Sequence, residues 1–123
     1  MAHILIADDD PEIRDSLVKL LGLVGHEVTS VENGHEAIEL LGSEAFDLMI
    51  TDILMPRRDG LECVMHVRKN HSGMPVLAIS GGARTDTYLK LAETMGAVKT
   101  FHKPFPPREL LAKVDELLGA QPA

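Results

Sequence analysis

Acidic side chains follow two short apolar segments of the sequence. Asp8, Asp9 and Asp10 come directly after His3–Ala7, and Asp52 follows a second apolar segment in the middle of the chain. Carboxylates that lie close together repel one another and raise each other's pKa unless a cation neutralises them. Mg²⁺ suits such a site, because it binds a few carboxylate oxygens and keeps places for water and phosphate oxygens. If the fold brings these residues together, we expect a magnesium site there.

Asp52 has a second chemical use, because a carboxylate can attack phosphorus and form an acyl phosphate. Position and charge neutralisation do most of the work in such a transfer. Two other side chains could assist: the Lys103 ammonium would neutralise an incoming phosphoryl group, and the Ser80 hydroxyl would donate a hydrogen bond to it. Each residue alone also has an ordinary interpretation. Asp10 before Pro11 is typical of a helix N-cap, Ser80 of a turn, and Lys103 of a solvated side chain.

Length and composition restrict the classes of protein that the chain can belong to. Its 123 residues are 45% hydrophobic and 25% charged, which is typical of one globular domain. The formal charge of −7 argues against a direct nucleic-acid binder, which would carry a basic face. We find neither an apolar run long enough to span a bilayer nor a secretory signal, and a single cysteine fits a reducing compartment. We therefore expect a cytoplasmic protein without a membrane partner.

Five apolar segments alternate with five helical patterns along the chain. The predicted strands are His3–Ala7, Glu27–Val31, Phe46–Thr51, Met74–Ser80 and Gly96–His102. The predicted helices run from Pro11 to before Gly25, from Asn33-Gly34 to near Gly42, and over Gly60–Lys69, Thr85–Met95 and Pro106–Leu118. This alternation predicts an α/β fold, a doubly wound parallel sheet with helices on both faces. All strands of a parallel sheet end at one edge, so the fold would gather Asp8, Asp52, Ser80 and Lys103 there.

Four motifs in these elements carry a family resemblance. They are ILIADDD at 4–10, DLMITDILMPRRDG at 47–60, LAISGG at 77–82 and FHKPF at 101–105. Together, in this order and at this spacing, they resemble the receiver domain of bacterial two-component response regulators, and the match covers essentially the whole chain. The resemblance implies a flavodoxin-like (βα)5 fold with strand order 2-1-3-4-5. It also implies that 1–123 form one receiver domain without an output domain, similar to a single-domain chemotaxis regulator.

The resemblance also assigns roles to individual residues. It implies that Asp52 is the phosphoacceptor, that Asp8 and Asp9 hold Mg²⁺ together with Asp52 and the backbone carbonyl of Leu54, and that Ser80 and Lys103 contact the phosphoryl group. The donor would be a sensor histidine kinase or a histidine phosphotransfer protein. The protein would catalyse only its own phosphorylation and dephosphorylation, and it would act as a monomer or a weak homodimer.

One position departs from the family pattern. Receivers usually carry Tyr or Phe three residues before the lysine, and here Thr100 stands at that position with Phe101 beside it. Neighbouring residues of a strand face opposite sides, so Phe101 cannot replace the usual aromatic. We therefore expect a switch that depends on Ser80 and the loop Gly81–Thr87. We also expect Tyr88, Leu91, Met95 and Thr100 to share an exposed partner-binding face formed by the fourth helix, fifth strand and last helix.

Two other functions remain open at this point. A phosphorylation-independent pseudo-receiver would share the fold, although the intact set of acidic residues, Ser80 and Lys103 argues against it. A small phosphatase of the haloacid-dehalogenase type also forms an aspartyl phosphate, and Asp8-x-Asp10 superficially fits its DxD motif. That alternative leaves Asp52 without a role.

Overall fold

The computed structural model describes residues 2–55, 59–82 and 85–119. The strands are β1 (His3–Ala7), β2 (Glu27–Val31), β3 (Leu48–Asp52), β4 (Val76–Ser80) and β5 (Lys99–His102). The helices are α1 (Pro11–Leu23), α2 (Gly34–Ser43), α3 (Gly60–Asn70), α4 (Thr85–Met95) and α5 (Pro107–Gly119). Strands and helices alternate along the chain as the sequence predicts.

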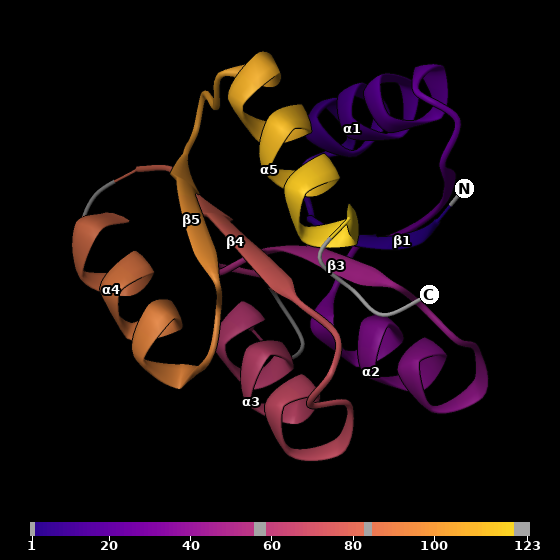
Figure 1. The fold of residues 1–123 in the computed structure, drawn as a ribbon. Coiled ribbons are helices and arrows are strands. Elements are labelled where there is room, and N and C mark those ends of the chain that lie inside the picture. The colour runs from indigo at the N-terminus through magenta and orange to yellow at the C-terminus, as the bar shows by residue number, and fades with distance from the viewer. Residues whose placement is uncertain (1, 56–58, 83–84, 120–123) are drawn as a thin grey trace.

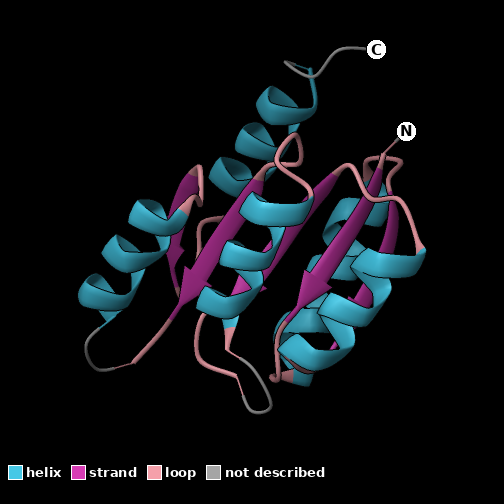
Figure 2. Cartoon of the chain, turned by 90° about the horizontal axis from the view of Figure 1, so that it is seen from below, coloured by secondary structure: helices cyan, strands magenta, loops and turns pink. Residues whose placement is uncertain are grey.

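The strands form one parallel sheet in the order β2-β1-β3-β4-β5, and their arrows point the same way in Figure 2. Helices α1 and α5 cover one face of the sheet, and α2, α3 and α4 cover the other (Figure 1). The doubly wound flavodoxin-like fold is thus confirmed, including its strand order. Because β1 and β3 are neighbours, the sheet places the residues after β1 beside Asp52 at the end of β3.

Alternating strand residues divide the core into two layers, which is expected of a sheet buried on both faces. On the α1 and α5 side, the fully buried residues are Ile4, Ile6, Leu17, Leu21, Leu48, Ile50, Leu77, Ile79 and Leu110, with Phe101 and Val114 nearly so. On the other side, the fully buried residues are Leu5, Ala7, Ala37, Met49, Ile53, Cys63, Ala78 and Ala92. The C-terminal ends of the strands are therefore held in place by buried side chains on both faces of the sheet.

Capping side chains start the three helices that flank the central strands. The side chains of Asp10, Asn33 and Asp59 accept hydrogen bonds from backbone N–H groups of α1, α2 and α3 at 2.9, 2.9 and 3.0 Å. Such caps satisfy N–H groups that have no partner within the helix. The capping role expected of Asp10 is confirmed, and this use of its carboxylate separates it from the acidic group formed by Asp8, Asp9 and Asp52.

Three predicted strands begin earlier in the sequence than the observed ones. Residues 46 and 47 precede β3, where the Asp47 carboxylate accepts a hydrogen bond from the His3 N–H at 2.8 Å. Met74 lies in a turn and donates its N–H to the His71 carbonyl at 2.9 Å. Gly96 has a φ of +131° and ends α4, so β5 begins only at Lys99. Before β4 and β5, apolar residues extended the predictions into a turn and a helix end, whereas before β3 the prediction began two residues early.

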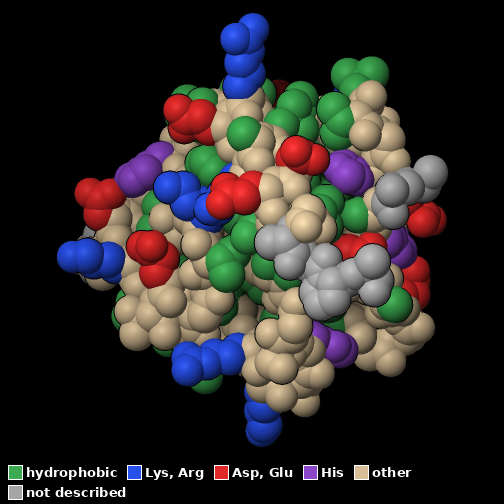
Figure 3. Space-filling view, viewed as in Figure 1, with side chains coloured by type: hydrophobic (Ala, Val, Ile, Leu, Met, Phe, Trp, Pro, Cys, Tyr) green, Lys and Arg blue, Asp and Glu red, His purple; other side chains and the backbone are tan. Residues whose placement is uncertain are grey.

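Charged side chains of both signs are interspersed on the face shown in Figure 3, where Lys and Arg stand singly. Within the described residues, no helix has the length and apolar character needed to cross a bilayer.

Candidate functional site

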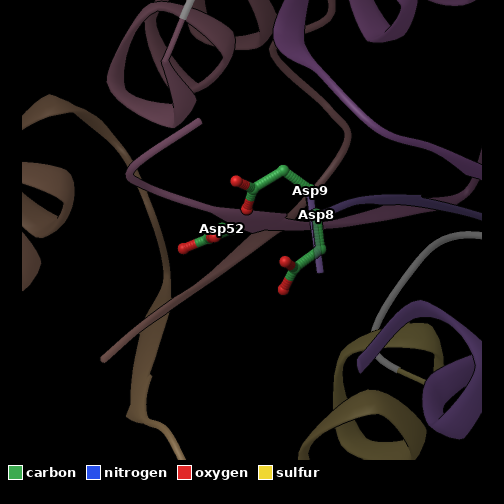
Figure 4. A group of neighbouring side chains, drawn as sticks. All are labelled: Asp8, Asp9 and Asp52. Atoms are coloured by element: carbon green, nitrogen blue, oxygen red, sulfur yellow. The ribbon is translucent and has the colours of Figure 1, made fainter. Parts of the chain in front are cut away.

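Three carboxylates meet at the edge where the parallel strands end. Asp8 and Asp9 lie just beyond β1, and Asp52 is the last residue of β3 (Figure 4). One ligand oxygen from each lies within 4.8 Å of the others. Asp8 is fully buried and Asp52 is 4% exposed, whereas Asp9 is exposed to solvent. The cluster predicted from scattered sequence positions therefore exists in the fold, with an open side at Asp9.

Lys103 reaches into this acidic group from the segment after β5. Its Nζ lies 2.8 Å from Asp8 Oδ2 and 3.1 Å from Asp52 Oδ2. The stem of the side chain passes Gly81, where an added Cβ would lie 3.0 Å from Lys103 Cβ. The following Lys103–Pro104 peptide bond is cis. One ammonium thus bridges two buried carboxylates that would otherwise repel each other.

Burial and neighbouring charges alter the acidity of the central groups. The pKa of Asp52 is raised from 3.8 to about 7, because burial and the charge of Asp8 together outweigh the opposing effect of Lys103. Burial lowers the pKa of Lys103, but its hydrogen bond to Asp8 and the charges of Asp52 and Asp8 outweigh that effect, so the net pKa is raised. The site therefore carries more negative charge than one lysine neutralises, which favours an additional cation.

Ser80 ends β4 next to these residues. Its side chain is fully buried, and its Oγ has no hydrogen-bond partner among the described residues. The Ser80 carbonyl accepts a hydrogen bond from the Lys103 N–H at 2.8 Å, which ties the two segments together. A buried hydroxyl without a partner is costly, because it has lost water and gained nothing. Ser80 therefore has a free donor available to a ligand at this edge.

A glycine allows a close approach that builds the site. At Gly60, the first residue of α3, an added Cβ would overlap the backbone carbonyl oxygen of Asp52. The Gly60 N–H donates to the Ile53 carbonyl at 2.8 Å, so the start of α3 is fastened directly behind Asp52. The sequence analysis placed Gly60 at the start of a predicted helix but gave it no packing role, and a glycine at a helix start was the available signal for such a close approach.

Leu54 follows the site on the chain. Its side chain is 43% exposed, whereas Ile53 before it is fully buried. The role of its carbonyl in metal binding stays a prediction. Residues 56–58 of the same motif lie outside the described residues, as do 83–84 of the loop that we expect to switch.

Thr100 and Phe101 face opposite sides of the sheet, which confirms the alternation inferred from the sequence. Phe101 is 6% exposed and packs with Leu110 and Val114 in the α1 and α5 layer. Thr100 lines a hollow of about 480 Å³ on the other side, beside residues of α4. Phe101 therefore does not occupy the place of the usual aromatic residue.

The predicted shared face of Tyr88, Leu91, Met95 and Thr100 is wrong in part. Met95 lines a separate hollow of about 840 Å³ with Ile38 of α2 and Met65 of α3. The α4 residues that border the hollow at Thr100 are instead Asp86, Thr87, Leu89, Lys90 and Glu93. The helical repeat was read with the wrong orientation, because the sequence does not show which side of α4 contacts α3.

Sequence reasoning also missed Arg14. Its Nη1 donates a hydrogen bond to the Asp8 backbone carbonyl at 2.7 Å, and its side chain is half-buried. A signal was available, because Arg14 lies near the N-terminal end of α1, where the helix dipole disfavours a cation.

The family can be assigned once this geometry is compared with known proteins. Residues 4–115 match the model of the response regulator receiver domain. The chain belongs to this family. Receiver domains are phosphoacceptor modules of two-component signalling and are not conventional enzymes, which removes the phosphatase alternative. A histidine kinase is the partner that membership of the family implies.

Relatives and solved structures agree with this assignment. The chain is 36% identical over 117 residues to the response regulator MprA of Mycolicibacterium vanbaalenii, and 34% identical over 119 residues to SaeR of Staphylococcus aureus. These matches cover 94% and 96% of this chain but only 50% and 51% of those proteins, so the chain spans about half their length.

Among solved structures, a CheY-like receiver domain protein of Methanospirillum hungatei superposes with a TM-score of 0.89 at 32% identity, covering 97% of this chain and 94% of that one. The chemotaxis regulator CheY4 of Vibrio cholerae superposes with a TM-score of 0.85 at 29% identity, covering 95% and 98% of the two chains. The likeness to these two structures therefore extends over nearly the whole of both chains in each pair.

The acidic group fits a divalent metal ion by the chemistry of its donors. Asp8, Asp9 and Asp52 offer hard oxygen ligands within a small volume, and the exposed Asp9 leaves access from solvent. Hard oxygen donors are typical of Mg²⁺ and Ca²⁺ sites rather than of zinc sites.

Proposed function

We propose that this receiver domain accepts a phosphoryl group on Asp52, with Mg²⁺ bound by Asp8, Asp9, Asp52 and the Leu54 carbonyl. The observation that carries the proposal is the position of Lys103. Its ammonium contacts the carboxylates of both Asp8 and Asp52, so a fixed positive charge stands beside the proposed nucleophile. Mg²⁺, when bound, supplies further positive charge to neutralise the acidic group and the phosphoryl oxygens.

The residues of the chain then have distinct tasks. An Asp52 carboxylate oxygen attacks phosphorus, the bond between phosphorus and the donor histidine nitrogen breaks, and that nitrogen keeps the electron pair. Lys103 stays close enough to neutralise charge on the new phosphoryl oxygens, while Ser80 Oγ donates its unused hydrogen bond to one of them. The ionised form of Asp52 is required, and neutralising cations favour it by lowering its pKa again.

Partners follow from this chemistry and from the family. The donor is a sensor histidine kinase or a histidine phosphotransfer protein, and the protein works in the cytoplasm as a monomer or a weak homodimer. The phosphorylated form binds a downstream protein through α4, β5 and α5, or it passes the phosphoryl group along a relay. Residues 1–123 act as one receiver domain.

Phosphoramidate provides a direct test, because its P–N bond resembles that of phosphohistidine. Intact protein is incubated with phosphoramidate and Mg²⁺ and analysed by mass spectrometry. We expect a mass gain of one phosphoryl group in the wild type, and none in Asp52→Asn or after chelation of the metal.

Asp115→Asn is the matched control, since it removes the same charge from an exposed position on α5. It should gain the phosphoryl group as the wild type does. Absence of any gain in the wild type, from phosphoramidate and from every histidine kinase offered, would support a phosphorylation-independent receiver instead.

A further inference from the structure

Arg14 holds the backbone of the acidic group from the side of α1. Its Nη1 donates to the Asp8 carbonyl oxygen at 2.7 Å. The ladder between β1 and β2 ends at Ala7 and Val31, after which the Asp8 N–H still donates to Val31 at 3.1 Å. The Asp8 carbonyl has therefore left the sheet, and a guanidinium has taken the place of a strand partner.

Every polar group of Asp8 has a contact, but these contacts control different parts of the chain. Asp8 Oδ1 accepts from the Asp10 N–H at 2.9 Å, and Oδ2 lies 2.8 Å from Lys103 Nζ. These two contacts hold the side chain. Among the described residues, only Arg14 holds the carbonyl, and that carbonyl is part of the rigid peptide plane that leads into Asp9.

Asp9 depends on this peptide plane for its direction. Its side chain is exposed, and none of the described residues donates a hydrogen bond to its carboxylate. Rotation of the Asp8–Asp9 peptide would swing the carboxylate away from Asp8 and Asp52, with which it now forms a compact set of oxygens. Helix stability does not explain an arginine here, because a cation near the N-terminal end of a helix opposes the helix dipole.

We propose that Arg14 is a positioning residue: it fixes the Asp8–Asp9 peptide so that the Asp9 carboxylate is aimed at the metal. This inference rests on the proposed function, since it concerns the same site. Its consequence is that the Mg²⁺ affinity of the protein depends on Arg14, and this affinity can be measured without a phosphoryl donor.

The sign of the effect separates positioning from simple electrostatics. Arg14 brings a positive charge to the backbone of the acidic group, so if only its charge mattered, its removal would strengthen Mg²⁺ binding. If it positions Asp9, its removal weakens Mg²⁺ binding. Loss of residues that orient a metal ligand typically lowers affinity by about 10- to 100-fold, and we expect about tenfold for Arg14→Ala.

The experiment is a Mg²⁺ titration of the whole chain followed by amide NMR, because the chain contains no tryptophan. Arg14→Gln removes the charge but keeps an N–H donor, and Arg14→Lys keeps the charge with a different donor geometry. Both should retain more affinity than Arg14→Ala. The matched control is Arg68→Ala, since Arg68 Nη1 also donates to backbone carbonyls, those of Thr94 and Met95 at 3.4 Å, away from the acidic group.

We expect Arg68→Ala to keep the wild-type dissociation constant within about twofold. Unchanged or tighter Mg²⁺ binding by folded Arg14→Ala, or an equal loss in Arg68→Ala, would overturn the proposal. If Arg14→Ala does not fold, tighter Mg²⁺ binding by Arg14→Gln than by the wild type would overturn it too, because that is the result expected from loss of the charge alone. Failure of the proposed function is distinguishable, because it appears in the wild type alone as an absence of phosphoryl uptake.

Discussion

Replacing Asp52 with asparagine should make the metal-free protein more stable. Asp52 is 4% exposed and lies beside the buried Asp8, and this environment raises its pKa from 3.8 to about 7. At neutral pH, the Asp52 carboxylate is ionised in the unfolded chain. Folding must therefore either bury this charge or protonate the carboxylate, and both cost free energy. An asparagine side chain would have a similar shape without a charge, and Lys103 would keep its contact with Asp8.

The magnitude follows from the difference between the two pKa values. A difference between 3.8 and about 7 corresponds to about 4 kcal/mol. Water at the open side of the site screens these charges, so we expect a gain of about 1–3 kcal/mol in the free energy of unfolding. The folded pKa is the higher one. The wild type therefore loses stability relative to Asp52→Asn as pH rises from about 4 to about 7, and the difference is constant above that.

Urea denaturation followed by circular dichroism measures this effect at several pH values between about 5 and 8 in the presence of a metal chelator. The advantage of Asp52→Asn should grow with pH up to about 7. Mg²⁺ should then stabilise the wild type and leave the variant nearly unchanged. Asp115→Asn, at an exposed position, should gain no stability as pH rises, and Mg²⁺ should stabilise it as it does the wild type. An Asp52→Asn variant that is no more stable than the wild type, or whose advantage does not vary with pH, would refute the reasoning.

Three further substitutions test other parts of the site and fold. Lys103→Met removes the cation that contacts Asp8 and Asp52 and so competes with Mg²⁺ for these carboxylates. In titrations at pH above about 8, Mg²⁺ should bind the variant roughly 3- to 10-fold more tightly than the wild type, and unchanged affinity would contradict this. Gly60→Ala would overlap the Asp52 carbonyl and should cost about 2–4 kcal/mol in urea denaturation, whereas Gly42→Ala, which has open space, should be neutral or stabilising. Phe101→Ala should cost about 3–5 kcal/mol because the ring is buried. A loss below about 1 kcal/mol there would contradict its place in the core.

The layout of the fold was predictable because its signals are local. The apolar segments and the capping residues Asp10 and Asn33 mark the elements directly. Parallel strands joined by right-handed helical connections must all end at one edge, so the meeting of Asp8, Asp52, Ser80 and Lys103 also followed. The first residues of strands were less predictable, because residues such as Met74 and Gly96 belong to a turn and a helix end that sequence hydrophobicity does not reveal.

The remaining features depend on contacts between distant residues. Arg14 donates a hydrogen bond to the backbone carbonyl of Asp8, and such a contact does not depend on the residue type at position 8. The fit of Gly60 against Asp52 depends on how closely α3 approaches β3. The orientation of Met95 depends on which side of α4 packs against α3, and the amphipathic repeat of α4 is compatible with more than one rotation about its axis.

The central claim is that Asp52 carries the phosphoryl group, and borohydride reduction tests it most directly. The protein is incubated with acetyl phosphate and Mg²⁺, reduced with borohydride, digested and sequenced by mass spectrometry. Reduction converts an aspartyl phosphate into homoserine and so marks the acceptor. We predict homoserine at position 52 alone, and only when the metal is present. Homoserine at Asp8 or Asp9 instead, or at no position after complete phosphodonor treatment, would contradict the account.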